Sequence, residues 1–360
     1  MIFQRALLRE FASLSGAVFM TLFLISLTVR LIRLLGQAAG GKLPSDAVVA
    51  LLGFFALNAL PILLSLTLFI SVLLTLTRSY RDSEMVVWFS SGLSIAAWIK
   101  PVLMFAGPLV VVIAALSLVI SPWSVQKSEE YRVSIDSRDE ISRVSPGVFG
   151  ESSSKDRVFF VESVSGDELT VQNVFVNSVQ HQKSGVMVSR RGHVETSPIG
   201  DRFLVLLNGH RYEGVPGDAD FRVMEFERYA TRIEAKEGVT PLVTQKSLST
   251  LALLESPTNT NRGELVWRVG VPLSALILAL LAIPMSFVNP RAGRSVNLLF
   301  ALVTYMLYSN LLSLSQARVA QGKLAFATGS WLVHGVMLAV LLFLFARRMG
   351  LLRLPRRASR

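Results

Sequence analysis

Six long apolar stretches, three on each side of a polar insert, constrain this chain more than any other feature. Each is free of charged residues and at least 19 residues long, the shortest running from residue 11 to residue 29. They are Phe11–Val29, Ala47–Thr77, Pro101–Gln126, Val269–Pro290, Ser295–Ala317 and Leu324–Ala346. A helix of that length crosses a hydrocarbon core of about 30 Å, where each backbone amide must be bonded within its own segment. The stretches therefore predict six membrane-spanning helices.

The placement of basic residues predicts how these helices are oriented. The net charge is +11 and the mean hydropathy is +0.50, which fits a membrane protein better than a nucleic-acid-binding one. With a cytoplasmic N-terminus, the short inside segments hold 13 Lys and Arg: Arg5, Arg9, Arg78, Arg81, Lys100, Arg291, Arg294, Arg347, Arg348, Arg353, Arg356, Arg357 and Arg360. The short outside segments and helix ends, without the insert, hold five: Arg30, Arg33, Lys42, Arg318 and Lys323. Both termini are therefore expected in the cytoplasm and the insert outside.

The chain divides into three parts on this pattern. Residues 1–126 form an N-terminal membrane half with three helices, and residues 268–360 form a C-terminal half with three more and a basic tail. Residues 127–267 form the external insert. The first helix is expected to stay uncleaved, because its apolar run is longer than a signal-peptide core. With no cysteine in the chain, the insert folds without disulfides.

The insert is predicted to be a domain of β-strands. Its segments Arg157–Glu162, Leu169–Val171, Val174–Val176, Val186–Val188 and Phe203–Leu207 are short, rich in β-branched or aromatic residues, and bounded by polar residues or Gly. Asn208-Gly209 is the strongest hairpin signal in the chain. Only Gln245–Leu254 reads as a short helix, leading back to the membrane. We expect an all-β sandwich or an open jelly roll.

A short helix is also expected in the cytoplasmic loop Arg78–Lys100, within about residues 80–92. Ser83 or Asp82 is placed to cap it, Glu84 lies in its first turn, and Ser90-Ser91-Gly92 ends it. Trp88 lies on this helix. Two interpretations remain open: a helix lying on the membrane surface, or a docking helix for a cytoplasmic partner.

The sequence contains no convincing catalytic or metal-binding pattern. Gly36–Lys42 has the spacing of a phosphate-binding loop, but Leu43 stands where the magnesium-binding Ser or Thr is required. The four histidines are scattered, and His334, inside the sixth apolar stretch, is expected to bond a neighbouring helix. Any ATP-driven work must therefore be done by another chain.

Arg30 and Arg33 are the most informative charged pair. They lie three residues apart, on one helix face, at the external end of the first span. Arginines there can reach the headgroups merely as anchors, but a paired guanidinium face also matches phosphate groups bidentately. We favour a site for a phosphorylated lipid, which Arg318 and Lys323, at the external end of the fifth span, would complete.

Over nearly its whole length the chain resembles the lipopolysaccharide-export permease family (LptF and LptG), and especially its LptF branch. The most specific stretches are Ala282–Arg294, the segment Leu207–Gly214 with the downstream Asp220-Phe221, and the opening Ile2–Glu10. The resemblance implies six transmembrane helices with an inserted periplasmic domain of the jelly-roll type, in the inner membrane of a Gram-negative bacterium.

The resemblance also implies a function and a set of partners. An LptF and an LptG subunit with two copies of the ATPase LptB extract lipopolysaccharide from the outer leaflet and pass it through the β domains to LptC. Arg30 and Arg33, with Arg318 and Lys323, are then expected to contact the lipid's phosphates. The cytoplasmic helix is the family's coupling helix, and its ATPase-contacting residues would be Arg81, Asp82, Glu84 and Trp88. The chain itself would need no cofactor.

Two other functions fit parts of the pattern. The first is an ABC permease that transmits mechanical force to a periplasmic domain, although such permeases typically have four spans. The second is a membrane scaffold or sensor whose β domain binds a periplasmic ligand, although the chain has no cytoplasmic segment long enough for an output module. Copurification with an ATPase would separate a transporter from a sensor.

Overall fold

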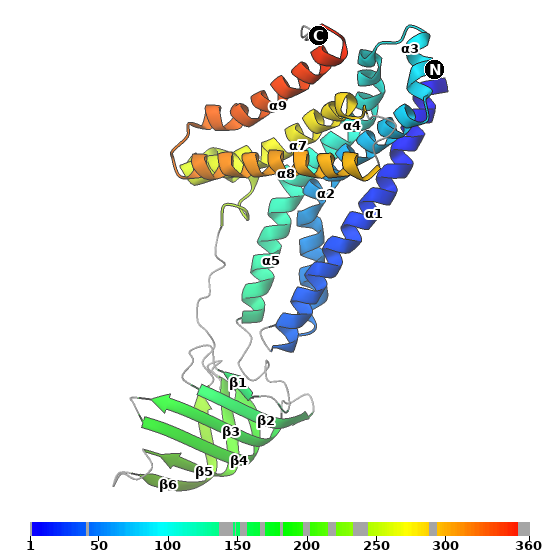
Figure 1. Ribbon diagram of the computed structural model, residues 1–360. Coiled ribbons are helices and arrows are strands. Elements are labelled where there is room, and N and C mark those ends of the chain that lie inside the picture. The colour runs from blue at the N-terminus through cyan, green and yellow to red at the C-terminus, as the bar shows by residue number, and fades with distance from the viewer. Residues whose placement is uncertain are drawn as a thin grey trace, which may run out of the picture. The chain divides into compact units, whose positions relative to one another are not determined.

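The computed structural model describes two compact units. Described are residues 2–40, 43–136, 147, 149–151, 157–165, 170–180, 183–196, 202–214, 221–232, 244–287 and 294–351. One unit, here called the helical unit, comprises Met1–Arg30, Leu51–Ser128 and Leu242–Arg360. The other, the sheet unit, comprises Leu31–Ala50 and Glu129–Pro241 (Figure 1).

Six helical segments among the described residues are long and apolar enough to cross a membrane, which confirms the predicted number. The first half contains α1 (Ile2–Ala39), α2 (Ala47–Arg81), α3 (Glu84–Ser90), the 3₁₀ turn η1 (Ile95–Trp98), α4 (Ile99–Ala115), the π-helical turn η2 (Leu116–Ile120) and α5 (Ser121–Asp136). The second half contains α6 (Thr250–Glu255), α7 (Asn259–Met285), α8 (Arg294–Ala320) and α9 (Phe326–Arg348). The third span is the continuous helical run from η1 through α5.

Two spans extend further into the expected insert than hydropathy indicated. The third run continues to Ile135, and α7 begins at Asn259 rather than at Val269. Thr258 caps α7 by accepting a hydrogen bond from the backbone N–H of Asn261 at 3.3 Å. The extra turns of α7 contain Glu264 and Arg268, and a rule that ends a span at the first charge cannot include them.

The core of the helical unit is formed chiefly by α2, α4, α7, α8 and α9. Phe69, Val102, Leu278 and Tyr308 are among its fully buried side chains. Helices α8 and α9 pack so closely that a Cβ on Gly329 would lie 2.2 Å from a methyl group of Val319, the close approach that small residues allow between membrane helices.

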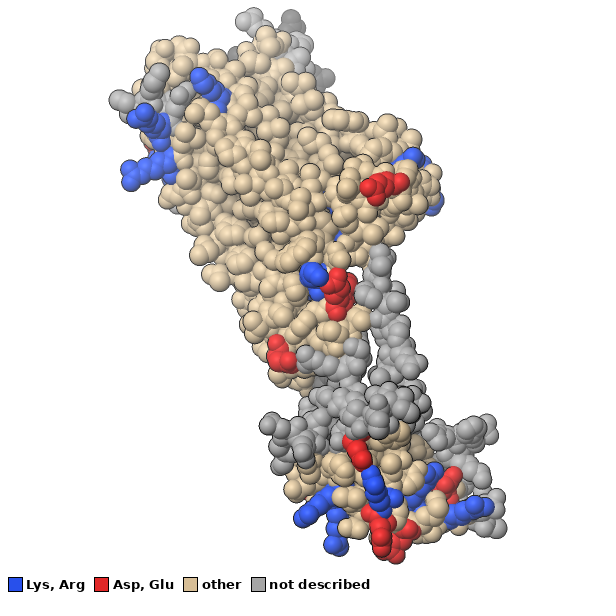
Figure 2. Space-filling view, turned by 180° about the vertical axis from the view of Figure 1, so that it is seen from behind, with Lys and Arg blue, Asp and Glu red and all other residues tan. Residues whose placement is uncertain are grey.

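The outer surface of the helical unit is largely free of charge. On the face drawn in Figure 2, a broad area contains no Lys, Arg, Asp or Glu, and the charged side chains lie near its margins. Long apolar side chains are exposed on several helices, including Leu24 on α1, Val111 on α4 and Phe300 on α8. Such a surface is suited to lipid or to another apolar subunit.

The sheet unit confirms the prediction of an all-β insert. Its described strands are β1 (Phe149–Glu151), β2 (Arg157–Ser165), β3 (Thr170–Gln180), β4 (Lys183–Thr196), β5 (Arg202–Glu213) and β6 (Arg222–Arg232). They form one antiparallel sheet in chain order, so each strand pairs with its neighbours in sequence. The described strands are thus an open meander rather than two stacked sheets (Figure 1).

The hairpin predicted at Asn208-Gly209 is wrong, because β5 continues through both residues. Asn208 adopts a left-handed backbone conformation with φ 52°, and Asn173 on β3 does the same with φ 50°. Asn tolerates this conformation better than most residues. The Asn-Gly signal therefore marks a local distortion inside a long strand instead of a chain reversal.

The two asparagines lie on a crease that crosses the sheet. The strand registers place Asn173, Arg190 and Asn208 next to one another, between regularly paired residues. On either side of this line the buried positions of β3 change parity: Val171 is buried before it, and Val174 and Val176 after it. Because a strand alternates its faces residue by residue, the crease keeps apolar residues on one face of a bent sheet.

Two contacts stabilise the crease. The Ser189 hydroxyl lies 2.7 Å from the carbonyl oxygen of Leu207 and 2.8 Å from that of Arg191, and can donate to either. The ring of Phe226 covers Gly209, where an added Cβ would lie 2.6 Å from the ring and 2.4 Å from the Val188 carbonyl oxygen. Glycine is therefore required at this position for packing.

Gly209→Ala is expected to destabilise the sheet unit, because the new methyl group overlaps a backbone atom. Overpacking of this kind costs about 1–3 kcal/mol. Gly185→Ala on β4 is the matched control, since its Cβ would meet only the Ser178 hydroxyl, at 3.3 Å, and the Ser178 carbonyl oxygen, at 3.7 Å. Resistance of the sheet to limited proteolysis on heating measures the effect, and equal resistance of the two variants would contradict this account of the crease.

Candidate functional site: a basic pair on α1, an ion-paired corner before α3 and a buried ion pair

Arg30 and Arg33 lie on the same long helix, α1, but in different surroundings. Arg30 is half-buried, and its guanidinium carbon lies 5.2 Å from the ring centroid of Phe55 on α2. Arg33 is exposed. A guanidinium group over an aromatic ring is held in place by a cation–π contact. Arg30 is therefore positioned by α2, whereas Arg33 is open to a ligand.

On the N-terminal side of this pair, α1 has an exposed apolar surface. Met20, Leu24, Ile25 and Val29 are each about half exposed or more. In a membrane these side chains contact acyl chains or another apolar helix. The combination of apolar side chains with arginines one helical turn further on matches an amphipathic lipid in both of its parts.

Arg318 and Lys323 lie at the other side of the helical unit. Arg318 is in the last turn of α8, and its carbonyl oxygen accepts a hydrogen bond from the backbone N–H of Lys323 at 3.0 Å. Both side chains are exposed. Figure 1 shows the connection between α8 and α9 at one edge of the helical unit and α1 at the opposite edge. The structure does not bring the two basic pairs together within this chain.

At the opposite end of α1, two of the four predicted coupling residues, Asp82 and Glu84, bond an arginine that sequence reasoning assigned only to topology. Arg78 forms ion pairs with Glu10, Asp82 and Glu84. Its Nη2 lies 2.7 Å from Glu10 Oε2, and its Nη1 lies 3.1 Å from Glu84 Oε1 and 3.2 Å from Asp82 Oδ2. Arg81 Nε bonds the other oxygen of Asp82 at 3.3 Å. The pair Arg78–Asp82, at helical spacing, was the available signal for this network.

The expected helix cap is wrong. Ser83 has φ 60°, in the left-handed region, and makes no capping hydrogen bond with its side chain. A capping residue needs an extended backbone for its oxygen to reach the helix N–H groups. Asp82 does not cap either, since both of its carboxylate oxygens bond arginines. The corner between α2 and α3 is thus held by ion pairs.

Helix α3 separates its apolar residues onto two faces. Met85 is buried, and Trp88 packs partly against the core of the helical unit. Val86 and Val87 are each 65% exposed, and Phe89 is 38% exposed. Trp88 thus fixes the helix to the membrane core, and the exposed valines form a surface for lipid or a partner.

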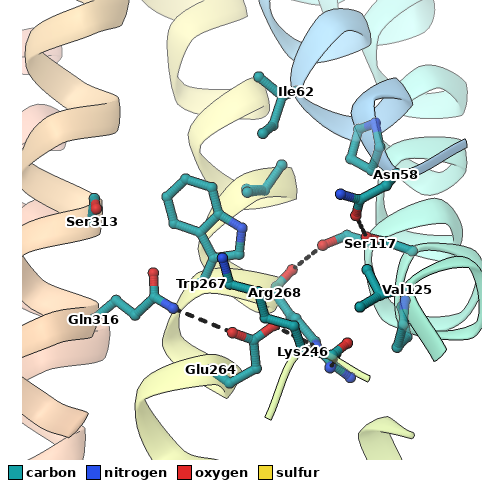
Figure 3. A pocket seen from close by; sticks show the side chains of 14 residues that line it. Asn58, Ile62, Ser117, Val125, Lys246, Glu264, Trp267, Arg268, Ser313 and Gln316 are labelled. Carbon is teal, nitrogen blue, oxygen red and sulfur yellow. Dashed lines mark hydrogen bonds and ion pairs between the residues drawn. The ribbon is translucent and has the colours of Figure 1, made fainter. Parts of the chain in front are cut away.

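A second ionic group, inside the helical unit, was missed altogether by sequence reasoning. Arg268 and Glu264 are one turn apart on α7, 3.1 Å apart from Nε to Oε1, and their side chains are only 3% and 8% exposed. They border a cavity of about 230 Å³ that is also lined by Asn58, Ser117 and Gln316 (Figure 3). Breaking such a buried pair by removing one partner costs about 3–5 kcal/mol.

Arg268 is bonded on every side. Its Nη1 donates to Thr250 Oγ1 at 2.9 Å. Its Nη2 lies within 3.2 Å of three backbone carbonyl oxygens, those of Gln245, Lys246 and Leu248. The other oxygen of Glu264 accepts a hydrogen bond from Gln316 on α8 at 3.2 Å (Figure 3). A buried charge with this many partners is compatible with a stable fold.

His334 behaves as the sequence suggested. Its Nδ1 lies 2.6 Å from the hydroxyl of Tyr308 on the neighbouring helix α8, and both residues are buried. Within the part of the chain that the structure describes, no group of three or more His, Cys, Asp or Glu is arranged to hold a metal ion.

Comparison with known proteins assigns the chain to a family. The family model "Lipopolysaccharide export system permease LptF/LptG" matches residues 5–347, a range that includes both membrane halves and the sheet. The chain belongs to the LptF/LptG permease family. It is similar to the lipopolysaccharide export system permease protein LptF of Escherichia coli K12, with 28% identity over 347 residues, covering 96% of this chain and 94% of that protein. The LptF protein of Shigella flexneri matches to the same extent.

Membership of the LptF/LptG family makes this chain a multi-pass permease subunit of an export system rather than a catalytic enzyme. The sequence-based assignment to the LptF branch agrees with these relatives. Of the stretch Ala282–Arg294, which carries part of the resemblance, residues 288–293 lie outside the described residues.

Proposed function

We propose that this chain is the LptF-type membrane subunit of an ATP-driven exporter that takes lipopolysaccharide from the outer leaflet of the inner membrane. The observation that carries the proposal is the family match across both membrane halves and the inserted sheet. In this proposal ATP hydrolysis belongs to a separate LptB dimer on the cytoplasmic side. An LptG-type permease forms the other half of the channel, and LptC receives the lipid.

The spacing of charges along α1 supports this assignment of sides. Glu10, which bonds Arg78 beside α3, lies 20 residues before Arg30 on the same helix. At 1.5 Å per residue this is about 30 Å, the thickness of the hydrocarbon core. The α3 corner and the basic pair therefore fit opposite membrane surfaces, and the basic bias of the short loops supports a cytoplasmic α3.

The basic residues at two edges of the subunit suggest how the lipid site is completed. A homologous second permease, related by an approximate two-fold axis, would bring its own α8 edge to the α1 edge of this chain. Arg30 and Arg33 of this chain would then face the partner's counterparts of Arg318 and Lys323. A phosphorylated lipid between the subunits would have cations on both sides and apolar helices around its chains.

The sheet unit supplies the next apolar surface in this scheme. One face of the sheet, here called the inner face, carries a cluster of buried apolar side chains with three aromatic rings packed beside it. The cluster includes Val161, Val171, Val174, Leu204 and Leu206, and the rings are Phe159, Phe226 and Tyr229. Apolar side chains of this kind can shield acyl chains from water on their way to LptC. The bend at the crease keeps them on a common face.

The proposed function predicts ATP-dependent lipid extraction by the complex and none by this chain alone. Liposomes containing lipopolysaccharide and this chain, with LptG-type and LptB partners, should transfer the lipid into the sheet unit only with ATP. A photocrosslinking phenylalanine analogue in place of Phe159, on the inner face, reports arrival, and one in place of Val188, exposed on the sheet, is the control. ATP-independent labelling, or ATP hydrolysis by the chain without LptB, would contradict the proposal.

Charge reversal at Arg33 should weaken lipopolysaccharide binding by the assembled complex. A hydrogen bond to a charged group contributes about 1.5–3 kcal/mol, so its loss lowers affinity by roughly tenfold or more. Arg33→Lys keeps the charge without the planar fork and should have a smaller effect. Arg30→Lys also loses the stacking of the planar guanidinium group on Phe55. Arg262→Glu, a reversal at an exposed residue near the start of α7, is the control. If Arg30→Glu, Arg33→Glu binds the lipid like the parent, this pair is not the lipid site.

Glu84→Ala should reduce LptB copurification and ATPase stimulation, if Glu84 contacts the ATPase as proposed. Because Glu84 also bonds Arg78, the variant disturbs the corner as well, and Glu10→Gln is the matched control. It removes a carboxylate from the same arginine but lies on α1 rather than α3. Equal losses in both variants would show that Glu84 acts only by holding the corner through Arg78. Val87→Asp, at the exposed surface of α3, should reduce copurification further.

A further inference from the structure

We propose that Arg268 is a positioning residue that ties both chain connections of the sheet unit to α7, so that movements of the membrane helices are transmitted to the sheet. The inference rests on the proposed function, because it concerns the coupling of ATP hydrolysis to lipid delivery. The chain leaves the helical unit through η2 and α5 and returns to it at residues 244–250. We call η2 with α5 the outgoing passage and residues 244–250 the returning passage. Both are bonded to Arg268.

The returning passage is held by the guanidinium group. Nη2 of Arg268 donates toward the carbonyl oxygens of Gln245, Lys246 and Leu248, at 3.1, 3.2 and 2.9 Å. These are the described residues nearest to the point where the chain comes back from the sheet. All three acceptors are backbone carbonyl oxygens. These hydrogen bonds therefore depend on the path of the chain and not on which side chains residues 245, 246 and 248 carry.

The outgoing passage is held in two ways. Ser117, in the π-helical turn, donates its hydroxyl to the carbonyl oxygen of Arg268 at 3.0 Å. Thr250 accepts from Arg268 Nη1 at 2.9 Å and donates to the carbonyl oxygen of Leu118. A π-helical turn often marks a functional site, and this one lies directly before the helix that leads toward the sheet. Thr250, in the returning passage, is thus bonded both to Arg268 and directly to the outgoing passage.

The ion pair with Glu264 fixes the guanidinium group on α7. Glu264 is itself bonded to Gln316 on α8, so the arrangement is attached to two membrane helices. Only arginine can do this, because its five N–H donors lie in one rigid plane and point in different directions, whereas lysine has three donors on a single nitrogen. The pair lies beside a cavity (Figure 3), so a lysine in place of Arg268 fits without displacing its neighbours.

The test uses Arg268→Lys in the complete complex with the LptG-type and LptB partners. The charge stays beside Glu264, but the fork that bonds the carbonyl oxygens of the returning passage and Thr250 is lost. Assembly and the ATPase rate should stay within about twofold of the parent, while lipid crosslinked at position 159 per ATP hydrolysed falls about tenfold, the factor for one charged hydrogen bond. Thr250→Val removes the bond to Leu118 and one acceptor of Arg268 but keeps the three carbonyl bonds, so it should lower the same ratio to a smaller degree.

Two controls separate coupling from folding. Gln316→Ala removes a partner of Glu264 and leaves both passages bonded. Ser313 lines the same cavity, and Ser313→Ala changes its lining without touching either passage. Both should keep the parental ratio of lipid to ATP. If Arg268→Lys lowers yield, ATPase rate and delivery in equal proportion, its role is only structural and the inference is overturned. An unchanged ratio in Arg268→Lys and Thr250→Val overturns it too. Failure of the parental complex to move lipid would instead contradict the proposed function.

Discussion

The structure depends on the fact that hydrocarbon cannot solvate a charge or an unpaired peptide group. This constraint makes the spans helical and moves most ionisable groups to the two membrane surfaces. On α1 it separates Glu10 from Arg30 by 19 residues of helix without a charged side chain. In the proposed exporter, a signal from the ATPase would therefore cross the bilayer through packed apolar helices, because α1 has no charged side chain between Glu10 and Arg30.

Where charges do lie close to the core, they are bonded to several partners at once. Arg78 joins three carboxylates from two helices and a turn, and Arg268 joins a carboxylate, a hydroxyl and three carbonyl groups. Arginine suits both places, since its planar donors can satisfy several acceptors without moving. The first group shapes the corner before α3, and the second lies where the sheet-bearing insert joins the membrane helices.

Sequence reasoning succeeded where a single local property decides the structure. Hydropathy gave the six spans, and β-branched content gave the strands, including β2 and β3. It failed at Asn208, because a left-handed asparagine is equally suited to a hairpin and to a crease, and only the neighbouring strands distinguish the two. Sequence reasoning also started the fourth span after Arg268, because a charged residue marks the end of an uncharged apolar stretch. The helix α7 in fact begins at Asn259.

The sequence by itself determined the number of membrane helices, the β character of the insert and the family, because these follow from composition and motifs along the chain. It also identified Arg30 and Arg33 as a pair on one helix face. Tertiary structure alone decided that Arg30 stacks on Phe55, that Arg318 and Lys323 lie at the other edge, and that Glu84 bonds Arg78. These depend on residues distant in sequence becoming neighbours, and an ion pair such as Arg268–Glu264 is stable in a membrane core only once the surrounding carbonyls are in place.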